Sequence, residues 1–405
     1  MSTIVIAGAR VFDGEKTLGV TTVVVADGRI ASVGGQVPTG AKTVDGSGST
    51  LLPGLIDAHV HTSRDSLAQA LRFGVTTELE MQGAQTRERR ASISADDSVA
   101  DVRSAGFAFS PPGGHPSELF PEGFTPGEGE GKPQGEPPYR PDATGPEAAA
   151  ASVPQLLATG SDYVKFMIDD GSVEGRSVPM LDQATLNAGV AAAKSYGALT
   201  VAHTLTIDAT RMAVEAGIDG LAHVFVEPHT DEIISMIKDS GAFVAPCVVL
   251  DASLMGITGA KFADDPRVAS RLTAEWDATL RSSFDCYHQG RLEDVLSTVR
   301  ALADAGVDLL VGTDVSTPLP FLGGLAHGAS VHHELQYLVR AGLTPSQALR
   351  AATATTARRF ALSDRGRIAE GLRADLLLVD GDPTTTISDT LNIRGVWRRG
   401  NRLVA

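Results

Sequence analysis

This chain has few cysteines, fewer basic than acidic residues, and no long apolar runs. Only two of the 405 residues are cysteines, Cys247 and Cys286, too few for the disulfide framework of a small secreted protein. The net charge of −15, from 34 basic and 49 acidic residues, argues against nucleic acid as a partner, because phosphates are bound by clustered Lys and Arg. No apolar run reaches the roughly 20 residues of a membrane-spanning helix, so we expect no membrane partner.

The N-terminal residues and the cysteines predict the compartment. Residues 1–8 have no basic segment followed by a long apolar core, so we expect no signal peptide. Two unpaired cysteines fit a reducing compartment, and we interpret both as buried small apolar side chains in preference to metal ligands. The expectation is a soluble cytoplasmic protein that forms a homo-oligomer.

The most informative segment present is 53–61, an apolar run that ends in His59 and His61. Side chains at positions i and i+2 of a strand lie on the same face, so both imidazoles can reach one divalent metal ion. Taken alone, such a pair more often consists of ordinary polar residues at the end of a buried strand. Four more candidate ligands, however, end short apolar segments further along the chain: Lys165, His203, His223 and Asp314.

Strand-like and helix-like segments alternate through the middle of the chain. The helix-like segments are rich in Ala and Leu and include 184–195, 207–216 and 292–305. This alternation predicts parallel βα units. The predicted strand ends lie near His61, Glu78, Ser110, Lys165, His203, His223, Pro246 and Asp314. A closed (β/α)8 barrel needs eight strands and carries its active site at their C-terminal ends, where the candidate ligands lie.

Both chain ends are rich in short Val/Ile runs separated by Gly and Asp, which is typical of small β structure. We therefore predict an α/β fold: a (β/α)8 TIM barrel over 53–365, and a small β-sandwich domain built from 1–52 and 366–405. A Gly-, Pro- and Glu-rich excursion over 111–145 interrupts the barrel. Long loops without periodicity are functional lids or disordered, and we interpret this one as a lid.

In this order, these segments resemble the amidohydrolase superfamily of metal-dependent hydrolases. The resemblance spans almost the whole chain and is carried by residues 24–30, 53–61, 312–314, 345–353 and 366–379. Lys165 together with Gly113-Gly114-His115 resembles the prolidase-like branch, which cleaves dipeptides and N-acyl amino acids and is related to imidazolonepropionase. Two positions depart from the relatives: Glu78-Leu79-Glu80 replaces an Arg-Asp pair, and Ala222-His223-Val224 replaces Glu-His-Gly.

The resemblance implies two divalent metal ions. His59, His61 and Asp314 would hold one ion, His203 and His223 the second, and Lys165 would bridge them as a carbamate. His and carboxylate ligands suit zinc, with manganese as an alternative. From the sequence alone, Lys165 is also compatible with an ordinary salt bridge to Asp162, Asp169 or Asp170.

The implied reaction is hydrolysis of a carbon–nitrogen bond in a small-molecule amide or dipeptide-like substrate. Bound metal ions lower the pKa of water toward about 7 and polarise the scissile carbonyl. Asp314 would move the proton from water to the leaving nitrogen. His115 is a candidate substrate contact by resemblance, and Arg64 is one because guanidinium binds carboxylate, although a surface loop position or a surface salt bridge is the alternative for each.

Two other classes stay open. A mononuclear cyclic-amide hydrolase or deaminase would not need Lys165, so that residue discriminates between the two enzyme classes. A non-catalytic scaffold on the same fold is the third class, and the retention of six convergent candidate ligands argues against it.

Overall fold

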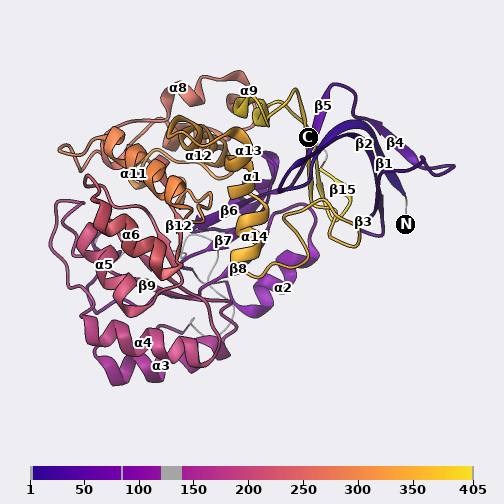
Figure 1. The fold of residues 1–405 in the computed structure, drawn as a ribbon. Helices are drawn as coiled ribbons and strands as arrows, with labels where there is room; N and C mark the ends of the chain where they lie inside the picture. Colours follow the sequence, from indigo (N-terminus) through magenta and orange to yellow (C-terminus); the bar gives the residue numbers. More distant parts are fainter. Residues whose placement is uncertain (1–2, 84, 120–138, 404–405) are drawn as a thin grey trace.

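The computed structural model describes residues 3–83, 85–119 and 139–403. Figure 1 shows an α/β chain with two parts: a group of long strands that carries the N-terminus, and a larger part in which helices surround short strands. Within the described residues, no helix has the length and apolar character needed to cross a membrane.

The strands from both chain ends form one sheet domain, as predicted. They are β1 (Ile4–Phe12), β2 (Thr17–Ala26), β3 (Arg29–Val33), β4 (Lys42–Asp45), β5 (Ser49–Pro53), β13 (Leu376–Asp380), β14 (Ile393–Arg398) and β15 (Asn401–Arg402). The order is β15-β14-β13-β5-β1-β2-β3, with β4 paired to β1, and the antiparallel pair β5–β13 joins the two chain ends. Hydrogen bonds therefore connect these strands into one continuous sheet. Its core includes Ile6, Leu378 and Trp397, all buried.

The larger part is built on short parallel strands. They are β6 (Leu55–Val60), β7 (Val75–Glu80), β8 (Asp101–Ser104), β9 (Val164–Met167), β10 (Thr200–His203), β11 (Gly220–Ala222) and β12 (Phe243–Ala245). They form two sheets, β6-β7-β8 and β9-β10-β11-β12. Parallel bridges extend both sheets: Phe109 pairs with Phe166, Leu309 with Val244, and Val315 with Val60.

The third and eighth predicted strands differ from expectation in length. β8 ends at Ser104, before Gly106, whose positive φ of +66° interrupts the extended backbone, and the chain rejoins the sheet at Phe109. In the eighth segment only the bridges at Leu309 and Val315 are formed, and Asp314 between them has a φ of +57°. The first irregular segment precedes His115 in the sequence, and the second contains Asp314.

Helices cover the outside of the barrel domain. They are α1 (Arg64–Arg72), α2 (Arg87–Ala95), α3 (Pro146–Ala158), α4 (Gln183–Ser195), α5 (Ile207–Ala216), α6 (Asp231–Ser240), α7 (Val248–Leu254), α8 (Ala260–Ala263), α9 (Pro266–Ala269), α10 (Ala274–Leu280), α11 (Leu292–Ala305), α12 (Ala329–Arg340), α13 (Pro345–Ala351) and α14 (Ala354–Arg359). The sequence located α4, α5 and α11 to within one residue. Their ends carry the usual signals: the Asp182 side chain accepts from the Thr185 N–H at the start of α4, and left-handed Gly217 and Gly306 end α5 and α11.

A buried cluster of charges joins the barrel to the C-terminal segment. The carboxylate of Asp101, on β8, is fully buried and lies 2.6 Å from Arg365, 2.9 Å from Arg373 and 3.5 Å from Arg398. Burial alone would raise the pKa of Asp101, but the three guanidinium groups outweigh it and hold the pKa below its usual value. The third barrel strand is thereby tied to residues near the end of the chain.

Candidate metal centre

His59, His61 and Asp314 form the tightest group among the predicted ligands. The Oδ1 atom of Asp314 lies 3.0 Å from Nε2 of His59 and 2.9 Å from Nε2 of His61. The Asp314 N–H also donates to the His59 carbonyl at 2.8 Å, so the eighth segment is fixed against the end of β6. One carboxylate oxygen thus sits between two imidazole nitrogens, a geometry suited to a shared cation.

A buried carboxylate beneath this group fixes its two backbone segments. Asp57 accepts from the N–H of His59 at 3.2 Å, and from the N–H and hydroxyl of Thr313 at 3.1 and 2.7 Å. The neighbouring Gly312 allows the close approach, because an added Cβ there would lie 3.0 Å from the Cβ of His59. In the Gly-Thr-Asp motif, Gly312 thus permits the close contact with His59, and Thr313 forms the hydrogen bonds to Asp57.

Lys165, His203 and His223 lie next to this group. The His223 ring is 4.7 Å from the His59 ring and 4.6 Å from the His203 ring, measured between centroids. His223 has a φ of +78°, directly after β11. Lys165 projects from β9 and is fully buried. The structure thus places His59, His61, His203 and His223 at or directly after the ends of β6, β10 and β11. Asp314 lies against His59 and His61, and Lys165 is the second residue of β9.

Several buried polar atoms of this group lack partners. Among the described residues, Nζ of Lys165 and both ring nitrogens of His223 make no hydrogen bond. A buried polar atom without a partner costs about 1 to 3 kcal/mol, so such atoms point to a missing ligand. Burial lowers the pKa of His59 to about 3, which favours the neutral imidazole, and lowers the pKa of Lys165 to about 8, so its neutral amine is more accessible than that of a free lysine. Metal ligation requires a neutral imidazole.

Asp169 is a site residue that the sequence reasoning considered only as a partner of Lys165. Its Oδ2 lies 2.7 Å from Nε2 of His203, and its Oδ1 accepts from the Gly171 N–H at 2.7 Å. Its position four residues after Lys165, at the end of the same apolar run, was the signal that could have identified it.

His115 lies against the same histidine. Its ring stacks on His203 at 4.4 Å, and its Nδ1 lies 2.6 Å from Oε1 of Glu118. His115, Asp169 and His203 are buried, and their ligand atoms lie within 4.8 Å of one another. The loop histidine is therefore part of the histidine group and not a surface residue.

Cys247, which the sequence predicted to be a buried apolar side chain and not a ligand, is buried and lies near the centre. Its Sγ lies 3.6 Å from Nδ1 of His59, and with His59 and His223 it forms another compact trio. Burial raises the pKa of the Cys247 thiol well above its usual value, so the neutral thiol is favoured. Its place directly after the predicted seventh strand end, Pro246, was the available signal.

One predicted substrate contact lies apart from this group. Arg64 starts α1, its side chain is half exposed, and its guanidinium pairs with Asp96, so the structure gives no support to a substrate contact. The guanidinium is not free for a substrate carboxylate, because Asp96 at the end of α2 already pairs with it. The predicted lid, 111–145, is described only at its two ends; residues 120–138 lie outside the described residues. Tyr163 is buried, and its hydroxyl donates to the Glu80 carbonyl at 2.8 Å.

The chain belongs to the amidohydrolase family, whose sequence pattern matches residues 136–403. An uncharacterized protein of Mycobacterium tuberculosis is 27% identical over 362 residues, which cover 89% of this chain and 85% of that protein. Imidazolonepropionase of Deinococcus deserti is 37% identical over 108 residues, 26% of each chain. A solved Xaa-Pro dipeptidase with bound methionine shares the fold, with a TM-score of 0.74, 21% identity and complete coverage of both chains.

These comparisons confirm the family predicted from the motifs and show the fold to be a TIM-barrel domain with an added sheet domain. The protein is therefore a hydrolytic enzyme that acts on carbon–nitrogen bonds, the reaction class of its family.

Proposed function

We propose that this enzyme is a binuclear metal-dependent hydrolase that cleaves an amide or peptide-like bond of a small molecule. The single observation that carries the proposal is the amine of Lys165: it is fully buried on β9, the neighbour of the strand that ends in His203, and it lacks a hydrogen-bond partner in the described part of the chain. A lone buried ammonium beside cations would be repelled, whereas a carbamate formed from the amine and carbon dioxide would be attracted.

The donor set fits two divalent ions. His59, His61 and Asp314 would hold one, His203 and His223 the other, and carbamylated Lys165 would supply an anionic oxygen to each. Imidazole and carboxylate donors suit zinc. The orphaned nitrogens of His223 and the orphaned amine of Lys165 are the atoms that such ions would engage.

When bound, two such ions would supply a nucleophilic hydroxide at neutral pH and polarise the scissile carbonyl. Asp314 has the position to move the proton, because its carboxylate touches His59 and His61 while its side chain keeps 16% of its surface exposed. It would accept a proton from the nucleophile and deliver it to the leaving nitrogen. His115, on the loop after the third strand, would contact the substrate beside His203.

A mononuclear cyclic-amide hydrolase or deaminase is the alternative. The observation that favours it is the compact trio of His59, His61 and Asp314, which by itself offers three ligand atoms within 4.8 Å of one another. Three protein ligands and an open position are sufficient for a catalytic zinc site. The two classes differ in the metal count and in the need for Lys165.

The deciding experiment is elemental analysis combined with substitution of Lys165. We expect about two divalent metal ions per chain in the wild-type enzyme. Lys165→Ala should lose metal occupancy and activity, and small carboxylates such as formate or propionate should restore part of both. Lys194→Ala is the matched control, because that lysine is half exposed on α4.

The substrate assay that accompanies this experiment should include dipeptides, N-acyl amino acids, cyclic amides and xenobiotic amides. One metal ion per chain together with an active Lys165→Ala enzyme would overturn the binuclear proposal in favour of the mononuclear one.

A further inference from the structure

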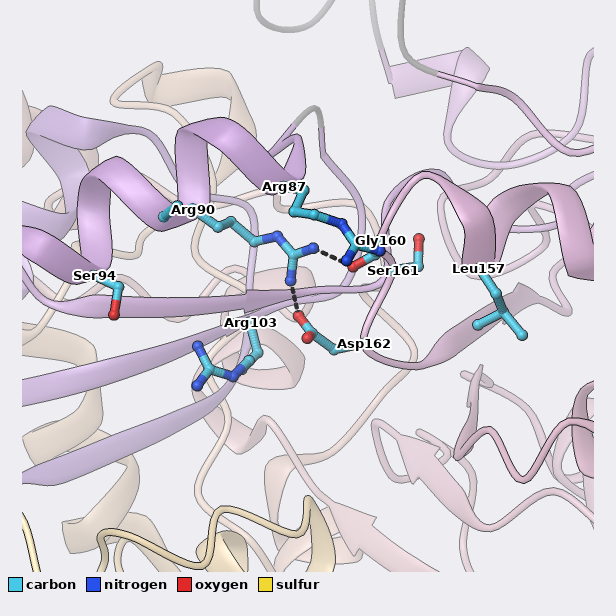
Figure 2. Close-up of a pocket in the computed structure, with 9 residues that line it drawn as sticks. Arg87, Arg90, Ser94, Arg103, Leu157, Gly160, Ser161 and Asp162 are labelled. Carbon is cyan, nitrogen blue, oxygen red and sulfur yellow. Dashed lines mark hydrogen bonds and ion pairs between the residues drawn. The ribbon is translucent and has the colours of Figure 1, made fainter.

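A cavity lined by arginines lies apart from the candidate metal centre. It has a volume of about 400 Å³ and is lined by Arg87, Arg90, Ala91, Ser94, Arg103, Leu157, Gly160, Ser161 and Asp162. None of these residues is a proposed metal ligand. Figure 2 shows Arg87 and Arg90 projecting from α2 toward Gly160 and Asp162, which precede β9, with Arg103 on β8 beside them.

The cavity carries an excess of positive charge. Three guanidinium groups line it against the single carboxylate of Asp162, a difference of two charges. This local excess is opposite in sign to the net charge of the chain, which is −15. Arginine guanidinium groups bind phosphate and carboxylate oxygens through paired hydrogen bonds.

Arg90 forms the fixed wall of the cavity. Its side chain is only 10% exposed, and its two amino groups donate to the Asp162 carboxylate and the Gly160 carbonyl. Its Nε, together with the hydroxyl of Ser161, is buried without a hydrogen-bond partner among the described residues. Two unused donors therefore lie beneath the lining of a positively charged cavity.

Arg103 forms a second wall. Its Nη1 donates to the Val102 carbonyl at 3.1 Å and lies 3.7 Å from Asp101. Asp101 is already neutralised by the closer groups of Arg365 and Arg373. The positive charge of Arg103 is thus only weakly balanced within the protein.

We propose that this cavity binds a small dianion, specifically the phosphate group of a metabolite or free inorganic phosphate. A dianion matches the charge difference, Arg87, Arg103 and Ser94 line the cavity with hydrogen-bond donors, and the volume is sufficient for a small ligand. Asp162 in its wall stands three positions before Lys165, so β9 connects this anion site to the candidate metal centre.

The test is titration of the metal-loaded full-length enzyme with inorganic phosphate and with glycerol 3-phosphate, at an ionic strength held constant with sodium chloride. Calorimetry and thermal unfolding both report the binding, because a ligand of the native state raises the midpoint of unfolding. Saturation by both probes is expected. Tighter binding of glycerol 3-phosphate identifies a metabolite ester as the ligand, and tighter binding of inorganic phosphate identifies the free ion.

Substitutions locate the site. Arg87→Gln and Arg103→Gln should each weaken binding by about 10-fold or more, since a hydrogen bond to a charged group contributes that much. Arg89→Gln, on the exposed side of α2 and outside the cavity lining, should leave binding unchanged. Unchanged binding in both cavity variants, with loss of binding only on metal removal, would place the anion on the metal centre and overturn the proposal. Absence of saturable binding would overturn it as well. Neither result depends on turnover, so the proposed function is tested separately.

Discussion

The Nε2 atom of His203 lies 2.7 Å from the Oδ2 atom of Asp169, and both side chains are buried. This contact uses one of the two ring nitrogens of His203 and leaves Nδ1 as the nitrogen available to a metal ion. A carboxylate that holds the second nitrogen of a ligating histidine fixes the tautomer and the orientation of the ring. Asp169 therefore acts on the proposed second ion through His203.

Substitution of Asp169 tests this positioning role. Asp169→Ala should reduce metal affinity by about 10- to 100-fold, the usual cost of losing such a partner, as measured by competition with a chelator. Asp169→Asn should recover part of the loss, because its amide oxygen can still accept from Nε2. Asp170→Asn is the control, since that neighbour is exposed. Equal loss in the Asn and Ala variants would indicate that the carboxylate binds the metal directly.

Asp314→Asn should keep the fold but lower kcat by at least two orders of magnitude, because loss of a general acid/base typically costs about 10²- to 10⁴-fold. Circular dichroism and elemental analysis accompany the kinetic measurement. Turnover like that of the wild type in a metal-loaded variant would remove Asp314 from the proton transfer.

His115→Ala should lower kcat/KM while leaving the metal content unchanged, because the residue lies on a loop and its Nδ1 is already engaged by Glu118. Steady-state kinetics and metal analysis of one preparation check both parts. Loss of a metal ion in this variant would identify His115 as a ligand, in line with the compact trio that it forms with Asp169 and His203.

Asp101→Asn should destabilise the fold by about 3 to 5 kcal/mol, because it leaves buried guanidinium groups without their counter-charge. Since the folded-state pKa of Asp101 lies below its usual value of 3.8, its stabilising effect is present at neutral pH and disappears as the pH falls through that lowered pKa. Urea denaturation at pH 7 measures the difference. Asp304→Asn, in the exposed pair with Arg300, should change stability by about 0.5 kcal/mol or less. A similar small change for Asp101→Asn would contradict the structural role of the cluster.

The sequence predicted the regular elements well. The helices α4, α5 and α11 follow from apolar periodicity and end signals, which are local properties. The third strand was predicted to end at Ser110, but β8 ends at Ser104, because the left-handed turn at Gly106 cannot be read from an apolar pattern. The domain limits at residues 52 and 366 and the homo-oligomer stay predictions.

The site was predicted where ligands end strands and was missed where ligands depend on side-chain contacts. His59, His61, Lys165, His203, His223 and Asp314 all follow apolar runs, and their convergence follows from barrel geometry. Their role as metal ligands stays a prediction. The roles of Asp169 and Cys247 follow from their distances to His203 and His59, which their positions at the ends of apolar runs do not specify. Arg64 looked available in the sequence because its partner Asp96 is 32 positions away.

The cluster around Asp101 also sets an order of events during synthesis. The carboxylate belongs to the third barrel strand, but the guanidinium groups that neutralise it come from Arg365, Arg373 and Arg398, at least 264 residues later. While the ribosome is still producing the barrel, this charge has no counterpart from these arginines and resists burial. We therefore expect the nascent barrel to complete its core only after the segment 365–398 has left the exit tunnel.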